Sequence, residues 1–359
     1  MFLYFSEYLI EWFSPLNAFT YITTRGILAA LTALVISFLF GPKIIENLQG
    51  NKISETIRSD GPSTHSSKGG TPTMGGLMII LSILVSVLIW SDLSNLYNLV
   101  LIASIISFGF IGFIDDYQKL KKSKKGMSAK SKFILQFIVA ASATYYLLAQ
   151  GSNVLSSEIL IPFTNNFRVD LGWMFLPFAI FVIVGSSNAV NLTDGLDGLA
   201  IMPVSMIAIA LGIFAYVTGN YNFAEYLDLP FLQDAGEVFV FCCAISGAGL
   251  GFLWFNTYPA QIFMGDVGAV SLGGILGTIA IIVKQELILA IMGGVFIMET
   301  LSVILQVGSF KLRGKRIFNM APIHHHFELK GWAEPKVIVR FWIITVFLVL
   351  IGLSSLKIR

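Results

Sequence analysis

Long apolar blocks separated by short polar breaks run along almost the whole chain. Each block is about 17 to 25 residues long, the length that a helix needs to cross roughly 30 Å of hydrocarbon. The pattern predicts ten membrane-spanning helices, near residues 18–45, 74–91, 96–114, 132–149, 173–190, 199–217, 238–255, 267–283, 287–308 and 337–356. We therefore expect an all-α polytopic membrane protein with a single domain, 1–359, and no second soluble domain.

Composition supports this assignment, because 55% of the 359 residues are apolar and only 12% are charged, whereas soluble domains have about 25% charged residues. Of the 23 Lys and Arg residues, 18 fall in or beside three loops, near 49–73, 115–131 and 309–336. The alternation of the predicted helices places two further loops on the same side, near 191–198 and 256–266, and these two hold no Lys or Arg. Basic residues near helix ends are retained on the cytoplasmic side. We expect these five loops to be cytoplasmic, and both termini to lie on the outer side.

Two adjacent carboxylates, Asp115 and Asp116, stand where the third predicted helix ends. Ionised groups at membrane depth are costly and usually functional. A plain helix cap is the weaker interpretation, because negative charge is unfavourable at a helix C-terminus. The pair could share a divalent cation, or one carboxyl could hold a proton for the other.

A second acidic segment follows the fifth predicted helix, where Asn191, Asp194 and Asp197 are spaced by three residues. On a helical turn this spacing would place all three on one face of oxygen ligands. Gly195 and Gly198 instead indicate a loop whose backbone approaches a ligand closely. A polar turn without a ligand is the alternative.

The link between the seventh and eighth predicted helices contains Asn256, Phe263 and Asp266. Asp266 stands directly before an apolar helix, where its charge would complement the positive end of the helix dipole. It could cap this helix, bind a metal ion, or do both.

Three of the four histidines, His324, His325 and His326, are consecutive in the last cytoplasmic loop. Successive side chains cannot all face one way in a helix or a strand, so we do not expect one ion bound by all three. One or two of them could contact a phosphate or carry a proton. An ordinary surface loop is the alternative.

Two further segments could bind phosphate. The lysine-rich run from Lys119 to Lys132 could do so, although most of its lysines are interpreted as topology determinants that attract anionic lipid. The Gly-rich segment that contains Lys68 and Thr73 could cradle phosphate oxygens, but it is not a Walker motif.

All of these motifs fall on the predicted cytoplasmic side. Carboxylates for a divalent cation and cationic groups for phosphates favour phosphoryl transfer between an anionic soluble molecule and an anionic lipid, with no nucleic-acid partner. A proton- or ion-coupled transporter is the alternative from another class. A transporter would place ionisable residues near the centres of several helices, and here the main such residue is Glu299 in the ninth predicted helix.

Four segments together resemble the polyprenyl-phosphate N-acetylhexosamine-1-phosphate transferases. They are Phe-Ile-Asp-Asp at 113–116, Asn-Leu-Thr-Asp-Gly-Leu-Asp-Gly at 191–198, Phe-Met-Gly-Asp at 263–266, and Pro-Ile-His-His-His-Phe-Glu-Leu-Lys-Gly-Trp at 322–332. The likeness spans essentially the whole chain. The run from Ala321 to Arg340 and the segment around Lys68 resemble the branch that uses a muramoyl donor rather than UDP-N-acetylglucosamine.

The resemblance implies that undecaprenyl phosphate attacks the β-phosphate of UDP-N-acetylmuramoyl-pentapeptide, giving lipid I and UMP in the first membrane step of peptidoglycan synthesis. A transferase that uses UDP-N-acetylglucosamine is the near alternative. The resemblance also implies a Mg²⁺ cofactor, a bacterial inner membrane with the active site on the cytoplasmic face, and a homodimer.

Roles for individual residues follow from the resemblance. The expected metal ligands are Asp266, Asp115 and Asp194, and the expected catalytic residues are Asp115, Asp116, Asp194, Asp266 and His324. Asp115 or Asp116 would deprotonate or position the lipid phosphate, with a covalent aspartyl-phosphate as the alternative. The expected phosphate-binding residues are Lys68, Lys119, Lys132, Asn191 and His324 to His326. The remaining expected substrate contacts are Asp197, Asn256 and Phe263, to uridine, with Thr73, Gly195 and Leu196.

Overall fold

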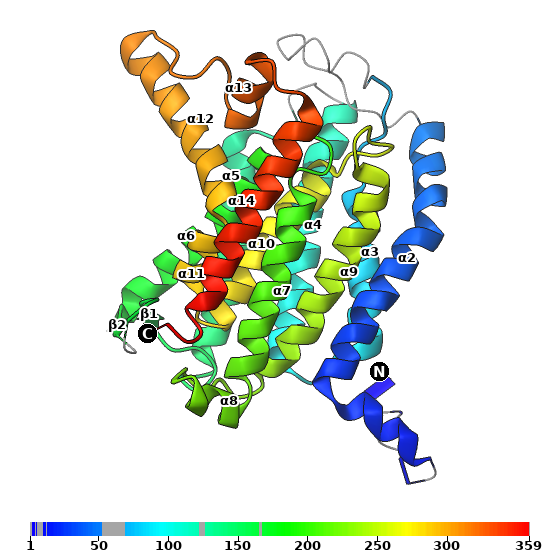
Figure 1. The fold of residues 1–359 in the computed structure, drawn as a ribbon, viewed down its shortest axis with the longest axis vertical. Helices are drawn as coiled ribbons and strands as arrows, with labels where there is room; N and C mark the ends of the chain where they lie inside the picture. The colour runs from blue at the N-terminus through cyan, green and yellow to red at the C-terminus, as the bar shows by residue number, and fades with distance from the viewer. Residues whose placement is uncertain are drawn as a thin grey trace.

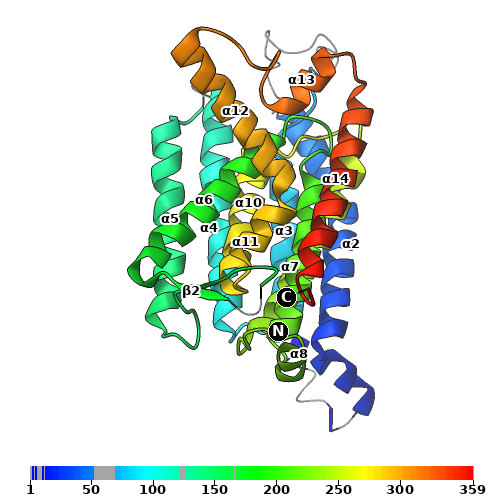
Figure 2. The same ribbon diagram turned by 60° about the vertical axis from the view of Figure 1, so that its left-hand side comes forward.

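The computed structural model describes residues 13–51, 69–121, 126–164 and 167–358, together with five residues nearer the N-terminus. The regular secondary structure of this part of the chain is helical apart from one antiparallel pair of short strands, β1 (Glu158–Leu160) and β2 (Arg168–Asp170). The long helices stand side by side in one bundle (Figure 1). Both ends of the chain and the strand pair lie at one end of this bundle, here called the hairpin end (Figure 2).

Among the described residues, nine helices are long and apolar enough to cross a membrane. They are α2 (Ile22–Gly50), α4 (Leu96–Lys121), α5 (Ala129–Ala149), α6 (Phe175–Thr193), α7 (Ile201–Thr218), α9 (Val238–Asn256), α10 (Gly265–Ile282), α12 (Gly294–Arg313) and α14 (Glu334–Ser354). The shorter apolar α3 (Gly76–Trp90) matches the second predicted block. The prediction of an all-α polytopic membrane protein is confirmed.

Short elements connect these helices. They are the 3-10 helices η1 (Ser14–Thr20), η3 (Gly172–Met174) and η4 (Ala235–Glu237), and the short α-helices α8 (Tyr221–Tyr226), α11 (Glu286–Met292) and α13 (Ile323–Leu329).

The ninth predicted block is two helices rather than one. α11 ends at Met292, and α12 starts at Gly294 and runs to Arg313. Gly293 and Gly294 have no side chain to restrict the backbone, so the chain can change direction here. α12 then leans away from the bundle at the end opposite the hairpin (Figures 1 and 2).

Three boundaries near the motifs differ from the prediction. α4 continues to Lys121, so Asp115 and Asp116 lie inside a helix rather than at its end. Lys119 and Lys121 in the last turn favour this extension, because positive charge stabilises a helix C-terminus. α10 starts at Gly265, which places Asp266 in the first turn of the helix. No side chain caps the N-terminus of α10, so Asp266 does not act as its cap. The histidine segment forms α13 instead of a loop.

α10 is the central helix, with 89% of its residues buried. Glycines let its neighbours approach closely: a Cβ added at Gly76 of α3 would lie 2.0 Å from Gly268 N, and one added at Gly112 of α4 would lie 2.2 Å from Asp266 O. This packing brings the beginning of α10 beside the carboxylates of α4.

Candidate functional site

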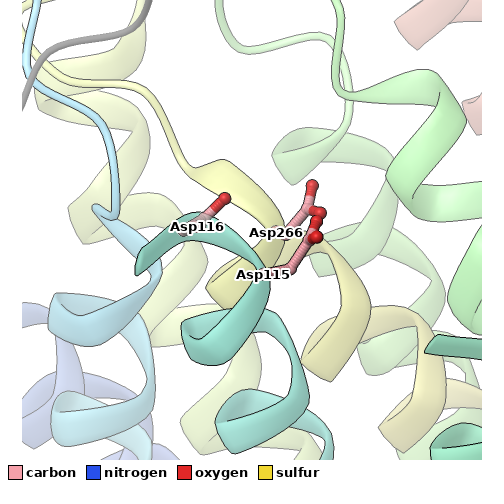
Figure 3. Close-up of side chains that lie close together, drawn as sticks. All are labelled: Asp115, Asp116 and Asp266. Carbon is pink, nitrogen blue, oxygen red and sulfur yellow. The ribbon is translucent and has the colours of Figure 1, made fainter. Parts of the chain in front are cut away.

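Three carboxylates meet at the end of the bundle opposite the hairpin, which we call the acidic end (Figure 3). Asp115 and Asp116 come from α4 and Asp266 from the first turn of α10, and one oxygen of each lies within 4.8 Å of the others. Asp115 and Asp116 are each only 4% exposed. Because charged groups removed from water are costly unless they are paired, this group, the acidic cluster, needs cationic partners.

Two lysines supply cationic partners. The Nζ atom of Lys119 on α4 lies 3.0 Å from Asp115 Oδ2, 3.2 Å from Asp116 Oδ1 and 2.9 Å from Asp266 Oδ2. The Nζ atom of Lys132 on α5 lies 2.6 Å from Asp266 Oδ2 and 3.4 Å from Asp115 Oδ2. With all five groups ionised, three carboxylates and two ammonium groups leave one negative charge, so the cluster can attract a further cation.

Neutral donors orient the same carboxylates. Each accepts a hydrogen bond from a different segment: Asp266 from Asn191 Nδ2 at 2.7 Å, Asp116 from Val267 N at 3.1 Å, and Asp115 from Met127 N at 2.5 Å. Side chains from α4, α5, α6 and α10 therefore meet at the acidic cluster.

The acidic cluster fits a hard divalent cation. Carboxylate oxygens are the ligands that Mg²⁺ prefers, and two helices hold three of them close together. The cluster contains Asp116 where the sequence analysis expected Asp194 as a ligand. Asp194 instead follows the last residue of α6, and its backbone N donates to Val190 O.

The three histidines have three different partners, as their succession in one helix predicts. His324 Nδ1 lies 3.1 Å from Glu299 Oε1, His325 Nδ1 lies 2.8 Å from Glu328 Oε2, and His326 Nδ1 accepts a hydrogen bond from Asn319 N at 3.1 Å. Burial, and then the charge of Lys330, lowers the pKa of His326. Its imidazole is therefore mostly neutral at neutral pH, which agrees with its acceptor role.

The sequence model of a family described as glycosyl transferase family 4 matches residues 98–284, just over half of the chain. The chain belongs to glycosyl transferase family 4. The match includes the acidic cluster, both lysines and Asn191, but neither Lys68 nor the histidines. Membership of family 4 supports a transferase that moves a sugar phosphate from a nucleotide-sugar donor to a polyprenyl phosphate, rather than a transporter.

In this family 4 chain, Asp197 and Asn256 hold two loops together. Asn256 Oδ1 accepts from Gly198 N at 2.9 Å, and its Nδ2 donates to Ile262 O at 2.8 Å. Asp197 Oδ2 accepts from Ala260 N at 3.0 Å. Both side chains are buried, so they support the walls of the site, and their contact with uridine stays a prediction.

The segment after residue 68 borders the cluster. Phe263 N donates to Pro72 O at 2.8 Å, which joins this segment to the start of α10. Gly265 has a φ of +70°, and a Cβ added there would lie 3.0 Å from Thr73 Oγ1. Thr73 is therefore placed beside the first turn of α10, whereas Lys68 lies outside the described residues.

Gly195 and Leu196 form the turn after α6, with Gly195 exposed and Leu196 buried. Sequence reasoning missed the backbone donor at Met127, because backbone hydrogen bonds leave no residue signature. It also missed Glu299 as the partner of His324. A lone acid inside an apolar helix was the available signal, and a transporter is the other class of protein in which such an acid is expected.

Proposed function

We propose that the chain transfers phospho-N-acetylmuramoyl-pentapeptide from its UDP derivative to undecaprenyl phosphate, giving lipid I and UMP. The observation that carries this proposal is the acidic cluster with its two lysines. Such a group can hold a cation and phosphates together, as a transfer between two anions requires. Family membership supports the reaction class, and the resemblance of the run from Ala321 to Arg340 supports the muramoyl donor.

The reaction exchanges one phosphoanhydride for another. An oxygen of undecaprenyl phosphate forms a bond to the β-phosphorus of the donor. The bond between this phosphorus and the oxygen shared with the α-phosphate breaks, and UMP leaves with that oxygen. Both reactants are anions, so the protein must reduce their repulsion and hold them in line.

Mg²⁺ is the cofactor that we propose, with Asp266 as the principal ligand and Asp115 and Asp116 beside it. When bound, Mg²⁺ would offset phosphate charge and polarise the P–O bond that breaks. Asp194 stays a proposed neighbour of the metal or the phosphates.

The lysines and aspartates around the cation have complementary roles. Lys119 and Lys132 each have a flexible stem and a compact charge, so each can exchange a carboxylate oxygen for a phosphate oxygen. Asp115 or Asp116 accepts a proton from the lipid phosphate or orients it. We assign phosphate contacts to His325 and His326 of α13 as well, whereas His324 is fully buried and would act on the site from behind them.

We also propose that the acidic end faces the cytoplasm of a bacterial inner membrane, because most of the basic residues fall in the loops that belong to this end. A soluble UDP-linked donor would then reach the site from the cytoplasm, and undecaprenyl phosphate would reach it from the bilayer. Residues 1–359 would act as one transferase domain within a homodimer.

UMP release by the purified protein with undecaprenyl phosphate tests the proposal. UDP-N-acetylmuramoyl-pentapeptide and UDP-N-acetylglucosamine are compared, each with Mg²⁺ and with chelator. We expect Mg²⁺-dependent release from the muramoyl donor alone. Asp266→Asn should abolish it, whereas Asp170→Asn, an exposed aspartate at the hairpin end, should not.

Release from UDP-N-acetylglucosamine instead would assign the chain to a different donor within the family. Absence of UMP with both donors, from folded protein supplied with lipid, would contradict the proposal.

A further inference from the structure

α12 brings a buried acidic side chain to the histidine helix. Glu299 on α12 and His324 on α13 both have 0% exposure, and His324 Nδ1 lies 3.1 Å from Glu299 Oε1. Within the described part of the chain, the side-chain nitrogens and oxygens of these two residues have no well-aligned hydrogen-bond partner. Buried ionisable groups need a partner, so each of these side chains depends on the other.

The second ring nitrogen of His324 faces the turn that follows α6. A Cβ added at Gly195 would lie 2.4 Å from His324 Nε2, so only a hydrogen atom fits between backbone and ring. The same turn continues α6, whose Asn191 donates to Asp266 of the acidic cluster. A continuous set of contacts therefore runs from Glu299 through His324 and Gly195 to the helix that orients Asp266.

A separate contact fixes the connector between α12 and α13. Gln306 Oε1 accepts from Phe318 N at 3.0 Å, and Gln306 Nε2 donates to Phe318 O at 3.0 Å. These bonds hold the connector without involving His324. The two contacts can therefore be removed one at a time.

We propose that Glu299 is a positioning residue for the transfer reaction. It holds the His324 imidazole against Gly195, and this contact sets the position of α13 relative to the end of α6. The inference rests on the proposed function, because His325 and His326 on the same helix are assigned there to substrate phosphates. Glu299 itself does not touch substrate.

A double-mutant cycle tests the inference, with kcat/KM for UMP release as the readout. We expect Glu299→Leu to lower kcat/KM about 100-fold, the effect of a displacement of roughly 1 Å in a site. Glu299→Gln keeps the shape and an acceptor oxygen, so it should retain activity within about threefold. In a His324→Leu background, Glu299→Leu should cost nothing further, because residues that act through one contact are not additive.

Two matched variants on α12 serve as controls. Ser302→Ala removes only a hydroxyl that donates to Glu299 O within the same helix, and should match the wild type. Gln306→Ala loosens the connector but leaves the His324 imidazole paired with Glu299. Any loss of kcat/KM in this variant, expressed as a free energy, should add to the loss caused by Glu299→Leu. Thermal unfolding and calorimetric binding of the UDP donor identify variants that do not fold.

Gly195→Ala approaches the same contact from an exposed turn, so it keeps the inference testable if Glu299→Leu does not fold. It should lower kcat/KM, and His324→Ala should remove that additional loss by making room for the methyl group. Three results would overturn the inference. The first is that Glu299→Leu and His324→Leu lower kcat/KM independently, so that the double variant loses the product of the two factors. The second is a Glu299→Gln variant with as low a kcat/KM as Glu299→Leu, and the third is a Gly195→Ala variant with wild-type rates. A wild-type protein without UMP release would overturn the proposed function as well.

Discussion

The two helices that hold the acidic cluster approach each other closely at Gly112, so Gly112→Ala is a direct test of the site geometry. A Cβ there would lie 2.2 Å from Asp266 O and 2.6 Å from Val267 N. Both atoms belong to the backbone of α10 and cannot rotate away. Ordinary contact begins at 3.4 Å, so α4 and α10 must separate by about 1.2 Å, the difference between 3.4 and 2.2 Å.

This separation acts on the reaction because Gly112 is one helical turn before Asp115 and Asp116. Moving α4 moves both carboxylates relative to Asp266. A misplacement of about 1 Å costs roughly 10²-fold in rate, so we expect kcat to fall about 100-fold, or about 2.7 kcal/mol of transition-state stabilisation. Overpacking costs about 1–3 kcal/mol of folding free energy, which a bundle of this size should tolerate.

Gly109→Ala is the matched control, one turn earlier on the same helix. Its added Cβ would lie 2.5 Å from Ile80 Cδ1, and the next nearest atom is 3.8 Å away. The end of an isoleucine side chain can rotate, so α4 should stay in place and kcat should stay near the wild-type value.

The assay is the initial rate of UMP release at saturating donor and lipid, with thermal unfolding to verify folding. Folded Gly112→Ala and Gly109→Ala proteins with rates within threefold of each other would disprove this prediction. The close approach of α4 to α10 would then not determine how Asp115 and Asp116 are placed relative to Asp266.

Three further predictions concern charged groups. Lys132→Met removes the ammonium group that lies 2.6 Å from Asp266 Oδ2, so kcat for UMP release should fall about 10²- to 10³-fold; an unchanged kcat would exclude a role in the transfer. Arg25 donates from Nη1 to Glu237 Oε2 at 2.8 Å and from Nη2 to Glu237 Oε1 at 2.5 Å near the hairpin end, so Arg25→Leu leaves Glu237 without this partner. The free energy of unfolding should fall by about 3–5 kcal/mol, which thermal unfolding would detect. Adding Glu237→Leu should largely restore it, and kcat should not change in either variant. Burial lowers the pKa of Lys284, so just below the usual lysine pKa of about 10.4 the unfolded chain binds more protons than the folded chain, and the free energy of unfolding should rise as pH rises. Lys284→Met should flatten this slope just below about pH 10.4, and an unaltered slope would contradict the assignment.

The helices were largely predictable, because a span is recognised from a window of about 20 residues that must match the thickness of the bilayer. Their ends were less predictable. The polar residues from Tyr117 to Lys121 show where the chain leaves the hydrocarbon, but a helix can continue into water. The break at Gly293 was also missed, since an apolar run has the same pattern whether or not its direction changes.

The residue types of the site were predictable one motif at a time, but only the family resemblance grouped Asp115 with Asp266 as ligands of one metal ion. Spacing by three residues put Asp194 with Asn191, and the structure ends α6 at Thr193, so the two side chains no longer follow one helical pattern. The cluster instead joins Asp116 to Asp266, which are far apart in the chain and meet across two helices.

The sequence by itself determined that the chain is an all-α polytopic membrane protein, and it predicted about ten membrane-spanning helices with the acidic and histidine motifs on one side. Solvent preference is a local property that each segment expresses independently of the others. Only the tertiary structure decided that Asp115, Asp116 and Asp266 share two lysines and that Glu299 meets His324. Those distances depend on how closely helices approach, and that approach is set by side chains, or their absence, on separate helices.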